Sequence, residues 1–155
     1  MNITKSNLRI ISYNMMWNTK YKQSVFNNII SAKNIIKPHI ICLQEVLNDT
    51  NTIFDNSKYH VYLNKSGPEQ MLTSWRTDRL RVLYMNNSEF DSGRPFAIIV
   101  LYDKLMNENI LLINIHWDHS KNVDNMFKII QSLINIHDTT QDINRILVCG
   151  NFNIS

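Results

Sequence analysis

The stretch Ile40-Ile41-Cys42-Leu43-Gln44-Glu45-Val46 (residues 40–46) places four apolar residues in a row before an amide and a carboxylate. A short apolar run rich in β-branched side chains predicts a strand buried on both faces. Glu45 follows at the point where this strand should end. Because open α/β sheets bind ligands at the carboxyl ends of their strands, Glu45 is either a satisfied strand-end residue or a member of a site.

The residues before this stretch predict a strand and a helix. Leu8–Tyr13 reads as a strand, and Lys20–Ile36 carries apolar residues at helical spacing before Pro38 ends the pattern. The opening is therefore a strand–helix–strand unit, whose two strands are expected to be parallel or neighbouring.

The middle of the chain has weaker patterns. We expect a short helix over Asn48–Ile53, a short strand over Tyr59–Leu63, a loop over Lys65–Arg79, a strand over Arg81–Met85 and a turn at Asn86–Asn87.

The last third predicts clear elements again. Phe96–Tyr102 and Ile110–Ile115 read as a hairpin with a turn near Asn107–Asn109, a helix runs from Asp124 to about Asp138, and Arg145–Cys149 is the final strand. This order indicates a layered α+β fold, and 155 residues fit one domain over residues 1–155.

Composition points to an ordinary globular protein. The net charge of +3 permits an anionic substrate without identifying one, and no basic tail of the nucleic-acid-binding kind is present. Cys42 and Cys149 fall in predicted buried strands, which favours inert core thiols over a disulfide and a reducing compartment. The N-terminus lacks an apolar signal region and no apolar run is long enough to span a membrane, so we expect an intracellular protein.

Polar residues stand at the ends of four predicted strands. They are Asn14; Glu45; His116 with Asp118 and His119; and Asn151 with Asn153. A lone Asn after a strand is usually a turn residue, and a lone His there is usually structural. Four strand ends of this kind together favour a site, because sites on such sheets are built from strand ends.

The motifs LRIISYN (8–14), IICLQEV (40–46), LLINIHWDH (111–119) and ILVCGNFN (146–153) resemble those of the endonuclease/exonuclease/phosphatase superfamily. The run Gly93-Arg94-Pro95-Phe96 is similar to the family as well. The resemblance covers nearly the whole chain and implies the N-terminal portion of a four-layer αββα sandwich, with mixed, mostly antiparallel sheets, flanking helices and a site at one edge.

The resemblance also implies a metal-dependent phosphoester hydrolase. Glu45 matches the family's metal-binding glutamate, for which Mg²⁺ or Mn²⁺ is the expected ion, and Asn14 matches the asparagine that supports metal and phosphate. The implied partner is a phosphoester substrate, with nucleic acid among the candidates.

Further residues match the family's phosphate-handling positions. His116 corresponds to the histidine that contacts the scissile phosphate, and Asn153 to the asparagine that holds phosphate or the attacking water. Asn151 stands at the catalytic position that follows the glycine, and we expect His119 and Arg94 to contact the substrate.

Two departures from the family pattern predict reduced activity. Asn151 stands where the family has an aspartate, and an amide cannot accept the proton of a water nucleophile. The chain also stops at Ser155, before the family's late S-D-H motif. We therefore expect a truncated or degenerate member with weak metal binding, either an impaired enzyme or a catalytically dead binding domain. The strand Arg145–Cys149 would be left as an open edge prone to self-association.

Two other interpretations carry less weight. Trp75, with nearby Arg76, Arg79 and Arg81, is suited to a nucleic-acid backbone, but a solvated loop and strand start is the preferred interpretation. The run His116-Trp117-Asp118-His119 also resembles the tail of a metallo-β-lactamase-type zinc signature, whose first histidine would fall at Asn114.

Overall fold

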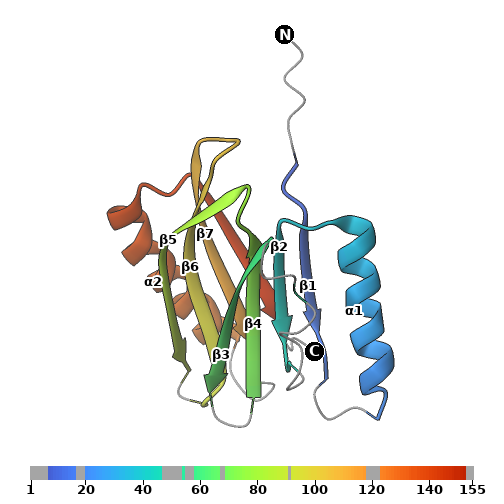
Figure 1. Cartoon of the computed structure of the whole chain (residues 1–155). Helices are drawn as coiled ribbons and strands as arrows, with labels where there is room; N and C mark the ends of the chain where they lie inside the picture. Colours follow the sequence, from blue (N-terminus) through green and yellow to red (C-terminus); the bar gives the residue numbers. More distant parts are fainter. Residues whose placement is uncertain are drawn as a thin grey trace.

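The computed structural model describes residues 7–16, 20–46, 54, 58–66, 69–90, 92–117 and 123–152, apart from the side chains of residues 66, 123 and 137–141. Two four-stranded sheets pack face to face, in the orders β1-β2-β4-β3 and β5-β6-β7-β8, with one helix on the outer face of each (Figure 1). The elements are β1 (Ile10–Asn14), α1 (Lys22–Ile36), β2 (Ile40–Gln44), β3 (Tyr59–Ser66), β4 (Glu69–Arg76), β5 (Leu80–Glu89), β6 (Pro95–Asp103), β7 (Glu108–His116), α2 (Val123–Gln141) and β8 (Arg145–Asn151). This is the predicted αββα sandwich.

The first sheet begins with the predicted strand–helix–strand unit. β1 and β2 are parallel, with Asn14 opposite Gln44 at their carboxyl ends. Between them, α1 ends at Lys37, which adopts a left-handed conformation and donates its N–H to the carbonyl of Lys33. Pro38 follows and prevents further helix. The buried Ile29 of α1 packs on the outer face of this sheet.

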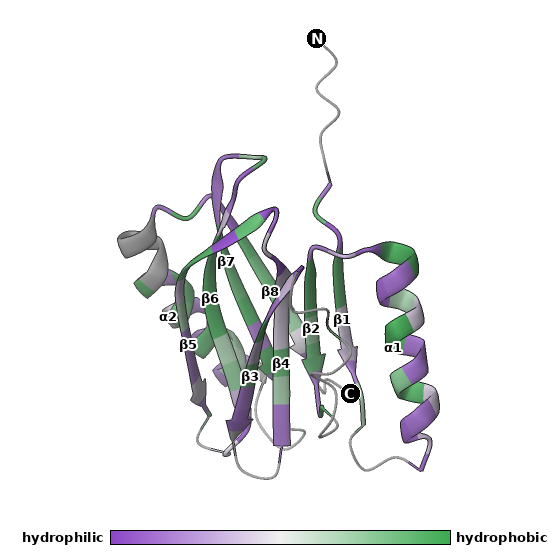
Figure 2. Cartoon of the chain, in the orientation of Figure 1, coloured by the Kyte–Doolittle hydropathy of each residue, from purple (hydrophilic) through white to green (hydrophobic). Residues whose placement is uncertain are grey.

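The second sheet contains the predicted hairpin and the last strand. β6 and β7 are antiparallel, and β8 returns parallel to β7 after α2. Met126 and Ile130 of α2 are buried against the outer face. Figure 2 shows hydrophobic residues along strands in the middle of the molecule, such as β2 and β6, and alternating hydrophilic and hydrophobic residues along α1.

The core between the sheets contains both cysteines. Ile40 and Cys42 from β2 pack with Leu101 and Leu112 from the other sheet, and the half-buried Cys149 of β8 joins them. Both thiols are free, in agreement with the expectation of unpaired thiols. The hydrogen bond with Cys149, together with burial, raises the pKa of Cys42 well above its ordinary value, so this thiol is protonated at neutral pH.

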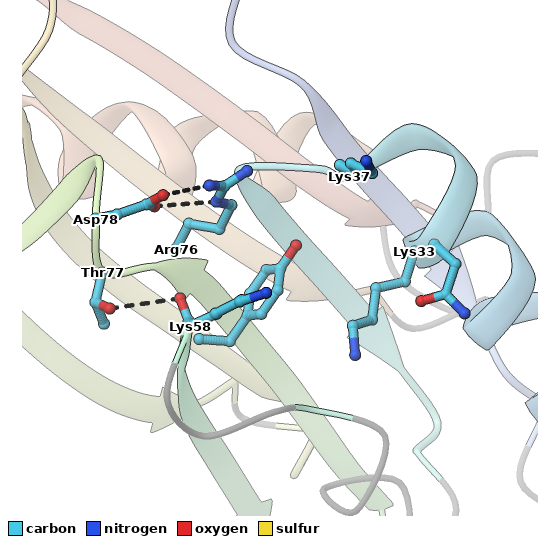
Figure 3. Close-up of a pocket in the computed structure, with 8 residues that line it drawn as sticks. Lys33, Lys37, Lys58, Arg76, Thr77 and Asp78 are labelled. Atoms are coloured by element: carbon cyan, nitrogen blue, oxygen red, sulfur yellow. Dashed lines mark hydrogen bonds and ion pairs between the residues drawn. The ribbon is translucent and has the colours of Figure 1, made fainter.

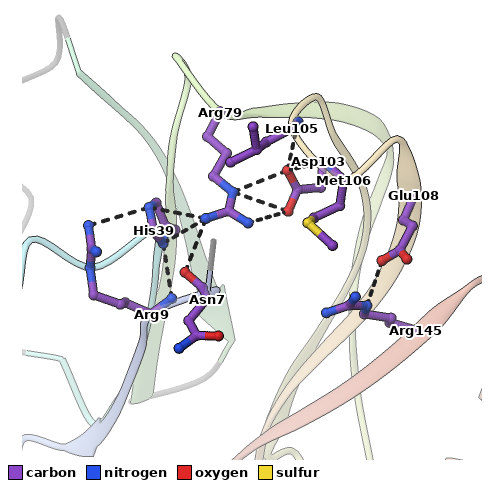
Figure 4. Close-up of polar contacts among 9 residues, drawn as sticks. All are labelled: Asn7, Arg9, His39, Arg79, Asp103, Leu105, Met106, Glu108 and Arg145. Atoms are coloured by element: carbon purple, nitrogen blue, oxygen red, sulfur yellow. Dashed lines mark hydrogen bonds and ion pairs between the residues drawn. The ribbon is translucent and has the colours of Figure 1, made fainter. Parts of the chain in front are cut away.

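A buried arginine, Arg79, links the second sheet to the amino end of β2 (Figure 4). Arg79, just before β5, makes a two-point contact with Asp103 at the end of β6, at 3.1 Å and 2.7 Å. Its Nη1 also donates to the carbonyl of Asn7 at 3.2 Å and lies 3.3 Å from Nε2 of His39. The guanidinium therefore ties the second sheet to the segments that enter β1 and β2.

The predicted loop over Lys65–Arg79 is wrong. Most of it forms β4, a central strand between β2 and β3, in which Thr73 and Ser74 are fully buried. Polar residues in a run normally indicate exposure, but here the neighbouring strands supply hydrogen-bond partners: Ser74 donates to the carbonyl of His60 at 2.9 Å. Tertiary packing overrides the local pattern.

The predicted turn at Asn86–Asn87 is also wrong. Both residues continue β5 and pair with Ile98 and Ala97 of β6, beyond a bulge between Val82 and Tyr84. β5 is an edge strand whose far half is exposed, so asparagine is tolerated there. The helix expected over residues 48–53 lies outside the described residues. None of the helices in the described part of the chain is long and apolar enough to cross a membrane.

Candidate functional site

Glu45 directly follows β2 and has a left-handed backbone conformation, with φ of +49°. Such a conformation costs a residue with a side chain about 1–2 kcal/mol. The neighbouring backbone enforces it, because Met15 N–H donates to the carbonyl of Gln44 at 2.8 Å and Val46 N–H donates to the carbonyl of Gln70 at 2.9 Å. Local strain of this kind is common at functional sites, and it directs attention to the Glu45 carboxylate.

Asn14 orients that carboxylate. Its Nδ2 donates to Oε1 of Glu45 at 2.9 Å, while its Oδ1 accepts the backbone N–H of Met16 at 2.8 Å. The parallel pairing of β1 with β2 puts Asn14 and Glu45 at the same sheet end. Asn14 thus acts as a bridge between the chain after β1 and the side chain of Glu45.

His116, the last residue of β7, faces Glu45 from the second sheet. Its Nε2 is 3.4 Å from Oε1 of Glu45, and its Nδ1 is 2.8 Å from Oε2 of Glu69. Burial and the nearby Arg94 lower the pKa of His116, against the opposing effect of the two glutamates, so the ring is neutral at pH 7. The Glu69 carboxylate accepts a hydrogen bond from Nδ1–H, so the neutral ring has its unprotonated Nε2 directed toward Glu45.

Arg94 and Glu69 complete the cluster. Nη1 of Arg94 forms an ion pair with Oε1 of Glu69 and lies 2.9 Å and 3.1 Å from the two ring nitrogens of His116. Glu69 was not predicted as a site residue, because its segment was assigned to a loop. Predicting an antiparallel strand beside β2 would have pointed to Glu69, because the first residues of such a strand lie at the carboxyl end of β2.

A buried polar network lies between the two sheets, next to the site. Gln44 donates to Oδ1 of Asn114 at 2.8 Å, and Asn114 donates to Oγ1 of Thr73 at 3.0 Å. Gln44 precedes Glu45, and Asn114 lies two residues before His116. The network therefore fixes the two strands that carry these side chains relative to each other across the sheet interface.

Asn151 lies beside His116 at the end of the neighbouring parallel strand. The two are opposite each other in the β7–β8 register, and the carbonyl of Asn151 accepts the N–H of Trp117 at 2.8 Å. Gly150, with φ of +152°, allows this close approach: a Cβ there would lie 2.1 Å from the carbonyl oxygen of Ile115. Glycine is required before Asn151 for that reason.

The structure brings five of the predicted site residues to one end of the sandwich, from both sheets: Asn14, Glu45, Arg94, His116 and Asn151. Asn153 and His119 lie outside the described residues. The preferred interpretation of a solvated loop around Trp75 is wrong, since Trp75 and Arg79 are buried. Trp75 stacks on His60 with ring centroids 4.6 Å apart, so it is not available to a nucleic-acid base.

The site has few side chains that could coordinate a divalent ion. In the described part of the chain, no group of three or more His, Cys, Asp or Glu side chains could hold a metal. Glu69 is engaged by Arg94 and His116, and the amide oxygen of Asn14 is engaged by Met16, which leaves Glu45 as the carboxylate to bind an ion. One carboxylate with several waters is a known mode for Mg²⁺ in phosphate chemistry.

Comparison with solved structures identifies the fold. The catalytic domain of human Nocturnin, solved with a bound sulfate anion, has a TM-score of 0.77 and 16% identity over 96% of this chain and 64% of that chain. D. rerio TDP2 with a single-stranded DNA product has a TM-score of 0.76 and 15% identity over 97% of this chain and 62% of that chain. An endonuclease/exonuclease/phosphatase from Bacteroides vulgatus has a TM-score of 0.75 and 17% identity over 96% of this chain and 66% of that chain.

The chain therefore has the fold of the endonuclease/exonuclease/phosphatase superfamily, as its motifs predicted. It spans 62–66% of the length of these solved structures. No family model and no curated protein matches the sequence.

Proposed function

We propose that this chain is a Mg²⁺- or Mn²⁺-dependent phosphoester hydrolase of the phosphodiesterase or nuclease type, with impaired turnover. The observation that carries the proposal is the convergence of Glu45, Asn14, His116 and Arg94 at one end of the sandwich. A carboxylate for a hard cation, with a guanidinium and an imidazole for a phosphate, suits phosphoester hydrolysis by water.

Glu45 would hold the metal, oriented by Asn14. When bound, the metal neutralises phosphate charge and increases the acidity of water. Once protonated by solvent at Nε2, His116 would donate a hydrogen bond from Nε2–H to an oxygen of the phosphoester, and the Glu69 carboxylate at Nδ1 stabilises the imidazolium form. Arg94 adds a fixed positive charge beside that oxygen. Asn153 and His119 complete the proposal as phosphate contacts.

Asn151 limits the rate in this proposal. It sits beside His116, at the position of the family's aspartate, and its amide holds a water without accepting its proton. General-base catalysis is worth roughly 10²–10⁴-fold, so restoring a carboxylate should increase turnover by up to about that factor.

The test uses purified chain with plasmid DNA, abasic DNA and a generic phosphodiester in the presence of Mg²⁺ or Mn²⁺. We expect slow metal-dependent cleavage that Glu45→Gln abolishes and Asn151→Asp increases. Glu45→Gln keeps the shape and the acceptor for Asn14 while removing the charge. Asn28→Asp, on the exposed face of α1, is the matched control for the added carboxylate. Cleavage by the Glu45→Gln protein at the unchanged rate would overturn the proposal.

Metal binding has its own measurement. Since only one carboxylate of the cluster is available, we expect weak, millimolar-range binding of Mg²⁺ in calorimetry, lost in Glu45→Gln. Tight binding would contradict the assignment of Glu45 as the main acidic ligand.

A second candidate is a catalytically inactive binding domain. Asn151 favours it, because an uncharged residue at this position removes proton transfer while leaving Arg94 and His116 to contact a phosphate. This candidate predicts no cleavage in any metal, even with Asn151→Asp, together with retained binding of a non-cleavable phosphodiester that Arg94→Gln weakens.

We also propose that the chain self-associates through β8. Within the described residues β8 pairs only with β7, and its Ile146 is 44% exposed. An apolar, unpaired strand edge can add a strand from a second copy. Light scattering should detect dimers at high concentration, with Ile146→Lys restoring the monomer; a monodisperse monomer of the unaltered chain would refute the idea.

A further inference from the structure

A cavity of about 780 Å³ lies at the opposite end of β2 from Glu45. It is bounded by the last turn of α1, by the start of β3 and by the end of β4, where the backbone N–H of Arg76 donates to the carbonyl of His39 at 2.9 Å. Its lining residues are Lys33, Asn34, Lys37, Lys58, Tyr59, Arg76, Thr77 and Asp78. The volume is in the range of small-molecule sites.

The lining is strongly cationic. Four cationic side chains and the single carboxylate of Asp78 give the cavity a formal charge of +3, equal to the net charge of the whole chain. Figure 3 shows Lys33 and Lys37 on the helix side, Arg76 and Asp78 on the strand side, and Lys58 between them. Lys33 and Lys37 also suit the negative end of the helix dipole, and Arg76 pairs with Asp78, but Lys58 has neither reason to lie there.

The backbone holds this arrangement in place. Thr77 N–H donates to the carbonyl of Lys58 at 3.0 Å, and the hydroxyl of the buried Tyr59 donates to the carbonyl of Pro38 at 2.8 Å. These bonds fix the start of β3 against the end of β4 and against the exit of α1. The backbone positions of the cations are therefore fixed before a ligand binds, and only their side chains need to be ordered.

The one acidic side chain does not neutralise the cavity. Asp78 pairs with Nε and one Nη of Arg76, so the other Nη group of that guanidinium is outside the ion pair. In the described residues no carboxylate forms an ion pair with Lys37 or Lys58. Repulsion from Asp78 would direct an anion toward the lysines.

We propose that this cavity binds adjacent phosphate groups. Several cations around one hollow match the clustered charge of a polyphosphate, and guanidinium and ammonium groups bind phosphate oxygens through charge-assisted hydrogen bonds. The buried aromatic Tyr59 offers no exposed face for a base, so recognition rests on the phosphates. The same chemistry occurs in a free polyphosphate and in a nucleic-acid backbone.

Calorimetry at low salt with sodium tripolyphosphate and with a single-stranded oligothymidylate tests the site. The variant is Lys37→Gln with Lys58→Gln, and the control is Lys22→Gln with Lys128→Gln, which removes the same charge from exposed positions on the two helices. We expect the cavity variant to weaken binding on the order of tenfold and the control to change it little.

Asp78→Asn supplies a gain of affinity that misfolding would not mimic. Removing the carboxylate from the cavity should tighten binding a few-fold. Tighter binding of tripolyphosphate than of the oligonucleotide identifies a free polyphosphate as the ligand, and the reverse identifies a nucleic-acid backbone. No binding of either probe, or an equal loss in cavity and control variants, overturns the proposal.

Discussion

Replacing Asp103 by asparagine should strongly destabilise the fold. The side chains of Arg79 and Asp103 are only 7% and 2% exposed. Asparagine keeps the shape of the carboxylate but leaves the buried guanidinium without an opposite charge. Breaking a buried ion pair by removing one partner costs about 3–5 kcal/mol. In a chain of this size 1 kcal/mol corresponds to about 2–4 °C in Tm, so the loss should be roughly 6–20 °C.

The chain provides a matched control in Asp78→Asn. Arg76 and Asp78 make the same two-point contact, but their side chains are 26% and 57% exposed. An exposed pair contributes about 0–1 kcal/mol, which predicts a Tm change of less than about 4 °C. Calorimetric melting and urea titration of both variants measure the difference.

The result that would refute this reasoning is a similar, small loss in both variants. It would mean that water or the remaining acceptors, such as the carbonyl of Asn7 at 3.2 Å, compensate Arg79 as well as a carboxylate does. If the dependence of the unfolding free energy on urea concentration changed, the denatured state would be altered. The stabilities of the two variants would then be compared at their unfolding midpoints.

Three further perturbations test other parts of the structure. Burial and the nearby Arg79, Arg9 and Arg76 lower the pKa of His39 from 6.5 to about 4. As the pH falls, the unfolded chain therefore binds a proton at His39 before the folded protein does. The free energy of unfolding should decrease between pH 6.5 and pH 4, and it should decrease less in His39→Gln. Gly150→Ala should destabilise by at least about 2 kcal/mol, because its methyl group meets a backbone carbonyl; a urea midpoint equal to that of the unaltered chain would contradict the strand spacing. Asn114→Leu should cost about 1–3 kcal/mol by leaving the buried Gln44 amide without its acceptor, and unchanged melting would indicate that water replaces it.

The local pattern predicted those elements whose residues face a simple environment. The apolar run at 40–43 is the pattern of a fully buried strand, and the helical spacing at 20–36 is that of a helix with one buried face. The structure has β2 and α1 at these positions. β4 was missed because a central strand with Thr73 and Ser74 inside a sandwich has no clear period. β5 was cut short because Asn86 and Asn87 resemble a turn, yet lie on an exposed edge strand.

The sequence by itself identified the polar residues at the strand ends. Asn14, Glu45, His116 and Asn151 could be named as a group because each follows a recognisable strand, and their types are those of phosphate chemistry. Only the tertiary structure decided their partners. Glu69 and Arg94 reach His116 because the antiparallel pairing of β4 and the packing of two sheets bring distant segments within 3 Å. The cationic cavity at the other end of β2 has the same origin: its lysines and arginine come from three separate segments, and no local pattern records that they meet.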